Sequence, residues 1–238
     1  MNTIAAVPAL DGRGTAGGAP LNLGMVTAPQ TFHQLGIFVL DGSGSMTDQT
    51  PDMMSKGEAT DLAARELLTL FKSSSAKNCF SFAAVAFDTS ADTKMQPNHL
   101  VQIDEFAQDF NPLAGHGGGT NIGAGLLEAE RIVTEFFANQ PSDGVPASAV
   151  LLLMSDGGHN EGPDVKTVAD QIKASSGGRV TICAALFATV GSPDPAGEAT
   201  LKSIVTDPNK GFSRVYRPED LRNFFKASVA RASGVQLR

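Results

Sequence analysis

The sequence contains few of the residues that mark several common classes of protein. It has no tryptophan, a single tyrosine, Tyr216, and only two cysteines among its 238 residues. The lack of tryptophan and the single tyrosine argue against a surface on which nucleic-acid bases or sugars stack. The cysteines, Cys79 and Cys183, lie far apart in sequence, which favours inert thiols in the core over a disulfide framework. The cysteine content therefore agrees with a reducing cytoplasm, where we expect the protein to reside.

Basic residues and long apolar runs are also scarce. The chain has 18 Lys and Arg against 25 Asp and Glu, a formal net charge of −7, which argues against nucleic acid as a partner. No apolar run reaches the roughly 18 residues that a membrane-spanning helix needs. The first residues lack the basic start of a signal peptide, so we expect no export and no contact with a membrane.

What is present is the composition of one globular domain with a short extension. Residues 1–33 are rich in Gly, Ala and Pro and show no sustained periodicity, so we interpret them as a loosely held N-terminal arm. Within that arm, residues 21–26 form a candidate edge strand. Hydrophobic residues make up 42% of the chain, as in ordinary globular proteins, and we assign residues 34–238 to a single domain.

Apolar runs and amphipathic segments alternate along this domain. The expected strands cover residues 35–40, 80–87, 147–154, 180–188 and 211–217, with 99–106 as a short edge strand. The expected helices cover residues 55–74, 121–139, 164–174, 196–205 and 218–232. Strands separated by amphipathic helices predict an α/β fold: a doubly wound, mostly parallel central sheet flanked by helices. Ligands of such sheets bind where loops leave the carboxyl ends of the strands.

Three polar loops occupy that position. They are DGSGSM at residues 41–46, GHGGGTNIGAG at 115–125 and MSDGGHN at 154–160, and we expect them to meet at one edge of the sheet. Together they supply two carboxylates and three hydroxyls, from Asp41, Ser43, Ser45, Thr120 and Asp156.

Such a set of oxygen donors suits Mg²⁺ or Mn²⁺. The glycines between the polar positions of the first loop let alternate side chains converge on one point. Two carboxylates only just neutralise a divalent ion, and neutral hydroxyls leave it electrophilic. The ion would therefore still attract an anionic ligand from outside the chain.

The order of these motifs resembles the metal-ion-dependent adhesion site (MIDAS) of von Willebrand factor A (VWA) domains. That site combines Asp-x-Ser-x-Ser, a distant Gly-Gly-Thr and a later Ser-Asp-Gly that follows a buried strand, and the resemblance covers residues 34–232. It implies a Rossmann-like fold in which Ser43, Ser45 and Thr120 contact the metal, while Asp41 and Asp156 act directly or through water.

The resemblance also implies a role for such a site in binding other proteins. The open coordination position would accept an Asp or Glu carboxylate of a partner protein. The chain looks like cytoplasmic bacterial VWA proteins of the tellurite-resistance or MoxR-associated kind. The partner would then be an AAA+ ATPase or a kinase and phosphatase pair.

Other interpretations of the same residues remain open. Asp41 alone is compatible with a turn, and Thr120 with a helix N-cap that also binds the metal. His116 and His159 raise the possibility of zinc, although we expect them at a solvent-exposed rim.

HGGG at 116–119 resembles an esterase oxyanion loop, but no G-x-S-x-G elbow accompanies it. A metal-dependent phosphohydrolase that uses the same loops is the alternative to a non-enzymatic binding module.

Overall fold

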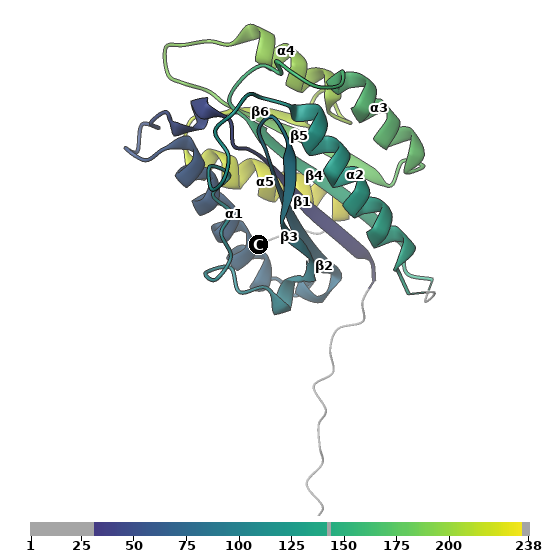
Figure 1. The fold of residues 1–238 in the computed structure, drawn as a ribbon. Helices are drawn as coiled ribbons and strands as arrows, with labels where there is room; N and C mark the ends of the chain where they lie inside the picture. The colour runs from purple at the N-terminus through teal and green to yellow at the C-terminus, as the bar shows by residue number, and fades with distance from the viewer. Residues whose placement is uncertain (1–30, 142–143, 235–238) are drawn as a thin grey trace, which may run out of the picture.

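The computed structural model describes residues 31–141 and 144–234 and shows a central sheet between two layers of helices (Figure 1). Its six strands lie in the order β3-β2-β1-β4-β5-β6. They are β1 (His33–Asp41), β2 (Phe80–Phe87), β3 (Ala91–His99), β4 (Ala147–Ser155), β5 (Val180–Phe187) and β6 (Phe212–Val215). All neighbours pair in parallel except β2 and β3. The predicted α/β fold with a mostly parallel sheet is confirmed.

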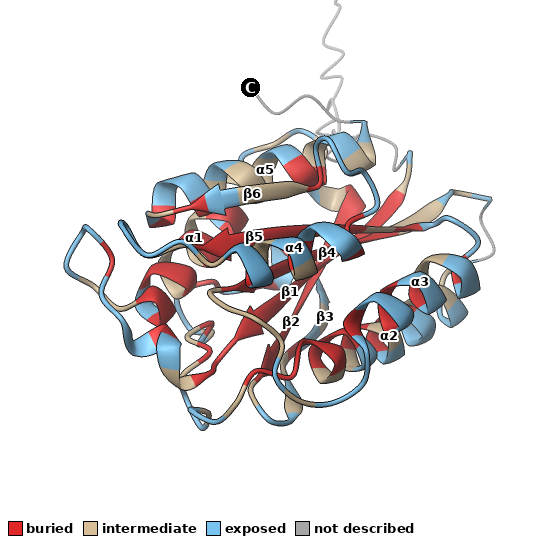
Figure 2. Ribbon diagram, turned by 90° about the horizontal axis from the view of Figure 1, so that it is seen from above, coloured by how far each residue is buried: buried red, intermediate tan, exposed pale blue. Residues whose placement is uncertain are grey.

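Five α-helices in the described part of the chain cover the two faces of the sheet. They are α1 (Lys56–Lys72), α2 (Ile122–Ala138), α3 (Val165–Ser175), α4 (Pro195–Ile204) and α5 (Pro218–Ser233). Helices α1 and α5 pack on one face, and α2, α3 and α4 pack on the other. Colouring by burial shows the strands mostly buried and the outer faces of the helices exposed (Figure 2).

The central strands are buried on both faces, which explains their continuous apolar sequences. Along β1, Phe38 and Leu40 belong to the core beneath α1 and α5, whereas Ile37 and Val39 belong to the core on the opposite side. Because β1 lies between β2 and β4, its carboxyl end is held in register with theirs. The loops that follow β1 and β4 therefore leave the same edge of the sheet.

The helices match the expected ranges to within two residues at each end, since local sequence marks their boundaries. Ser55 caps α1 through a capping box with Glu58, which fixes the start of that helix beside the first polar loop. Helix α5 has Pro218 in its first turn, and Gly234 follows its last residue with a φ of 70°.

The edge strand was predicted in the wrong place. It is β3, Ala91–His99, which runs antiparallel to β2, while residues 100–102 form a short 3₁₀ helix. Of the β3 residues, only Met95 is buried, so the strand shows little of the apolar pattern that reveals a strand in sequence. An edge strand of this kind is specified by its pairing partner more than by its own residues.

The N-terminal arm falls almost entirely outside the described residues, and so does the candidate strand at 21–26. Phe32 packs edge-on against Phe80, with ring centroids 5.4 Å apart, and β1 begins at the next residue. Cys79 and Cys183 are both free and buried. In residues 31–141 and 144–234, no helix combines the length and apolar character needed to cross a membrane.

Candidate functional site

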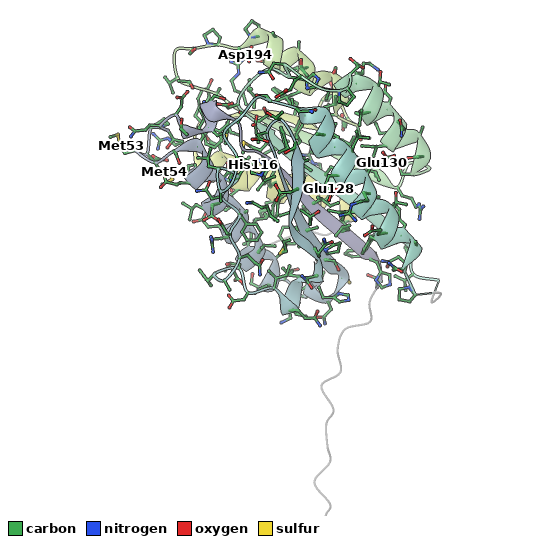
Figure 3. The ribbon with its side chains drawn as sticks, in the orientation of Figure 1. Met53, Met54, His116, Glu128, Glu130 and Asp194 are labelled. Atoms are coloured by element: carbon green, nitrogen blue, oxygen red, sulfur yellow. The ribbon has the colours of Figure 1, made fainter. Side chains whose placement is uncertain are left out.

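The three polar loops meet at the carboxyl ends of the strands. The Ser45 hydroxyl donates a hydrogen bond of 2.7 Å to Asp156 Oδ1, which joins the first loop to the third. The Gly44 N–H donates to the Gly118 carbonyl at 3.2 Å, which joins the first loop to the second. In Figure 3, His116, which lies two residues before Gly118, is labelled at this end of the molecule. The sheet thus brings together loops that are up to 111 residues apart in sequence.

Asp41 ends β1 and is fully buried, with 0% of its surface exposed. One carboxylate oxygen accepts a hydrogen bond from the Ser43 N–H at 2.8 Å, and the other accepts one from the Ser155 hydroxyl at 2.5 Å. Burial raises the pKa of the Asp41 carboxyl from 3.8 to about 6, and the negative charge of Asp156 acts in the same direction. Asp41 is therefore a costly buried charge that a nearby cation would stabilise.

The hydroxyl and carboxylate oxygens have the spacing expected for ligands of one small cation. Ser43 Oγ lies 3.2 Å from Ser45 Oγ, which in turn lies 2.7 Å from Asp156 Oδ1. Adjacent ligands of an octahedral Mg²⁺ site, with bonds of 2.0–2.1 Å, lie about 2.9 Å apart. Within the described residues, no three His, Cys, Asp or Glu side chains form a cluster that could hold a metal. The donor set thus fits a hard cation such as Mg²⁺ or Mn²⁺ and does not form a His- or Cys-based zinc site.

Thr120 lies immediately before α2 and is nearly buried. It is not the N-cap of that helix: Asn121 is, and its side chain accepts a hydrogen bond from the Ala124 N–H. The Thr120 N–H donates to Asn160 Oδ1 at 2.9 Å, and the Asn160 N–H donates to the Thr120 carbonyl at 3.1 Å. This pair of bonds joins the second loop to the third. The Thr120 hydroxyl is therefore not needed to cap α2.

Gly42 is required by close packing between loops. A Cβ at Gly42 would lie 2.3 Å from the Pro112 carbonyl oxygen and 2.8 Å from His116 Cβ. Neither Gly42 nor Gly44 has a positive φ, so bending of the backbone does not explain these glycines. They allow the segment that leads to α2 to lie directly against the first loop.

His116 differs from the expected solvent-exposed rim residue. Its side chain is only 5% exposed, with Nε2 at 2.6 Å from Asp92 Oδ1 and Nδ1 at 3.2 Å from Asp88 Oδ1. Asp88 also accepts a hydrogen bond from the Gly118 N–H at 3.1 Å. These contacts attach the glycine-rich loop to the turn between β2 and β3, which contains Asp88, and to the start of β3, which contains Asp92. His116 therefore holds the second loop in place.

Lys56, the first residue of α1, is a member of the site that the sequence did not reveal. Its ammonium group donates a hydrogen bond of 2.6 Å to Asp156 Oδ2, and the two side chains are only 4% and 2% exposed. Asp48 Oδ2 lies 3.6 Å from the same nitrogen. Lys56, Asp156 and Ser45 line a cleft of about 220 Å³. No motif in the three loops points to a lysine, so only the contact identifies it.

A larger cleft, of about 570 Å³, lies at the other end of the strands, away from the three loops. Its lining includes His33 at the start of β1 and Cys79 just before β2. Ligands of open α/β sheets bind at the carboxyl ends of the strands, and this cleft lies at the amino ends of β1 and β2. We therefore take the smaller cleft beside the three loops as the candidate site.

Comparisons with known proteins agree with the fold. A family model described as von Willebrand factor type A domain matches residues 37–228. No curated protein sequence matches the chain significantly. The matching solved structures include the pilus adhesin SpaC from Lactobacillus rhamnosus GG, with a TM-score of 0.65, 13% identity, and coverage of 85% of this chain and 30% of that chain.

Two further structures extend this comparison. The conserved hypothetical protein BatB from Bacteroides thetaiotaomicron has a TM-score of 0.59, 18% identity, and coverage of 85% of this chain and 99% of that chain. Proximal thread matrix protein 1 from the mussel byssus, with a zinc-occupied MIDAS motif, has a TM-score of 0.58, 16% identity, and coverage of 85% and 46%. The chain spans less than half the length of the first matched structures. Identities this low show a shared fold alone.

Proposed function

The chain belongs to the von Willebrand factor type A domain family, and on that premise we propose that it is a binding module in which a MIDAS-type divalent ion contacts an acidic side chain of a partner protein. The observation that carries the proposal is the convergence of Ser43, Ser45 and Asp156, whose oxygens have the spacing of adjacent ligands around one small cation. Asp41 lies beside them and accepts a hydrogen bond from the Ser43 N–H. Such a site lies on loops over a rigid sheet, where a partner can reach it.

The proposed ligands divide into two kinds. Ser43, Ser45 and Thr120 supply neutral hydroxyls, and Asp41 and Asp156 supply the negative charge that attracts the cation, directly or through water. The bound ion would supply a positive charge with an open coordination position for a partner's Asp or Glu carboxylate. The hydrogen bonds from Ser43 and Ser155 hold the Asp41 carboxylate in one orientation, which reduces the entropy lost when the ion binds.

We assign Mg²⁺ or Mn²⁺ to the site because its donors are all oxygens. The zinc-occupied MIDAS motif of the mussel protein supports a divalent metal at the same position of this fold, and zinc is therefore a useful comparison in metal titrations. We further propose a cytoplasmic, bacterial setting, with an AAA+ ATPase or a kinase and phosphatase pair as partner. The two free, buried cysteines are compatible with a reducing compartment.

We propose that the module is not an enzyme. A metal-dependent phosphohydrolase would need a base beside the metal, and the histidine that the second loop supplies, His116, is held between Asp88 and Asp92. Turnover of generic phosphatase substrates that disappears in Asp41→Ala would favour the hydrolase instead.

The test is an affinity capture with the immobilised chain in Mg²⁺ and in EDTA. Wild type is compared with Asp41→Ala and with a control, Asp170→Ala, which removes a carboxylate from the surface of α3. We expect a partner to be retained by wild type and the control in Mg²⁺, and by no variant in EDTA. Equal retention in EDTA would show that binding does not pass through a metal.

A further inference from the structure

We propose that Lys56 couples the binding of the metal to the binding of the acidic ligand, so that the site holds its ion weakly alone and more tightly with a carboxylate from outside. This inference rests on the proposed function and concerns the regulation of the same site. The observation behind it is the buried ion pair between Lys56 and Asp156, one of the five proposed metal ligands.

The ion pair occupies half of the Asp156 carboxylate. Oδ1 accepts the hydrogen bond from Ser45 on the side of the proposed metal ligands, and Oδ2 accepts the hydrogen bond from Lys56 at 2.6 Å. With both side chains almost fully buried, water screens this pair little. A cation that binds at Oδ1 therefore shares its negative ligand with a fixed positive charge.

The position of Lys56 in the helix indicates that Asp156, and not α1, requires the ammonium group. A positive charge in the first turn of a helix faces the positive end of the helix dipole, which is unfavourable. The start of α1 is already capped by Ser55 and Glu58, without the Lys56 side chain. At the other end of the same helix, Lys72 pairs with Glu105 where the dipole favours a cation.

The charges at the site then determine which complexes are favourable. Asp41, Asp156 and the Lys56 ammonium group leave one net negative charge, so a divalent ion converts the buried site to one net positive charge. An incoming carboxylate brings it to neutrality. Without Lys56, the ion alone would neutralise the site, and the added carboxylate would make it negative. Asp48 offsets part of the lysine charge, but its side chain is 60% exposed and well screened.

By thermodynamic linkage, the acidic ligand then strengthens metal binding by the same factor as the metal strengthens ligand binding. Lys56 destabilises the complex of the chain with the metal alone. It stabilises the complex that also contains the acidic ligand. A chain with this coupling would bind the metal mainly when a partner protein is also bound.

The experiment is a calorimetric Mg²⁺ titration in sodium acetate and in sodium chloride of equal ionic strength, where acetate is the probe for the carboxylate. The variants are Lys56→Met, which keeps the apolar stem, and Lys56→Arg, which keeps the charge. The control is Lys72→Met, which removes the other lysine from an ion pair of α1, about 24 Å along the helix. Thermal unfolding of each variant in EDTA verifies that it folds.

In chloride, we expect Lys56→Met to bind Mg²⁺ about tenfold more tightly than wild type, because a nearby positive charge is gone. Acetate should tighten Mg²⁺ binding in wild type and Lys56→Arg, and less so in Lys56→Met. Unchanged or weaker Mg²⁺ binding by Lys56→Met would overturn the coupling while leaving the metal site standing. No Mg²⁺ binding by wild type in either salt would overturn the proposed function together with the coupling.

Discussion

At the scale of single residues, Asp41 is subject to two opposing effects: its burial disfavours the ionised form, and the proposed metal would favour it. Its carboxylate is fully buried, and although Ser43 and Ser155 donate hydrogen bonds to it, burial raises its pKa to about 6. Ionised Asp41 therefore costs stability in the chain without metal, whereas in the proposed metal site the same charge would attract the ion. The proposed role of Asp41 would therefore lower the stability of the protein without metal, a trade-off that is common at binding sites.

We therefore predict that Asp41→Asn stabilises the metal-free protein at pH 7. The folded-state pKa is raised, so the burial penalty is absent below pH 3.8, grows between pH 3.8 and about 6, and is complete above that range. The gain at pH 7 should be about 3 kcal/mol and should vanish near pH 4. Urea unfolding in EDTA at several pH values measures it. A loss of stability at pH 7 would show that the hydrogen bonds of Asp41 outweigh its burial.

At the scale of elements, the loops of the site depend on the strands that carry them. Strand β4 lies between β1 and β5, and its residues are buried on both faces of the sheet. It places Asp156 opposite the end of β1, so the packing of β4 determines how the first and third loops meet.

Removing side-chain volume from this strand should be costly. Leu152→Ala, at a fully buried position of β4, should lower the free energy of unfolding by roughly 2–5 kcal/mol through the cavity it creates. The control is Leu127→Ala, at an exposed position of α2, which should change it by less than about 0.5 kcal/mol. Denaturant unfolding in EDTA measures the free energy of unfolding of both variants. Equal losses in the two variants would mean that burial of the side chain does not determine the loss of stability.

At the scale of the whole molecule, the site joins three loops that the unfolded chain keeps far apart. A metal that binds them together binds the folded state alone, so it should stabilise the entire domain by mass action. Its contribution depends on the free metal concentration and on an intact set of ligands.

We predict that Mg²⁺ at ten times its dissociation constant adds about 1.4 kcal/mol to the stability of wild type. Asp41→Ala should show no such gain. Thermal unfolding across a series of Mg²⁺ concentrations measures the effect, with Asp170→Ala as the control that should respond like wild type. An equal response of Asp41→Ala would place the bound metal elsewhere on the molecule.

The sequence by itself determined the helices, every strand of the described sheet except β3, and the place of the loops. Apolar runs such as residues 35–40 predict buried strands, amphipathic segments predict helices, and parallel strands bring their carboxyl ends to one edge. For this reason the sequence alone predicts Asp41, Thr120 and Asp156 at one site. Each of these signals is local, or follows from the local signals by a rule of topology.

The tertiary structure alone decided the contacts inside the site. Lys56 meets Asp156 across 100 residues, and Ser155 meets Asp41 across 114. His116 lies between Asp88 and Asp92, and β3 takes its place from pairing with β2. No periodicity encodes such pairings, because a side chain's partner across the fold depends on how whole elements pack.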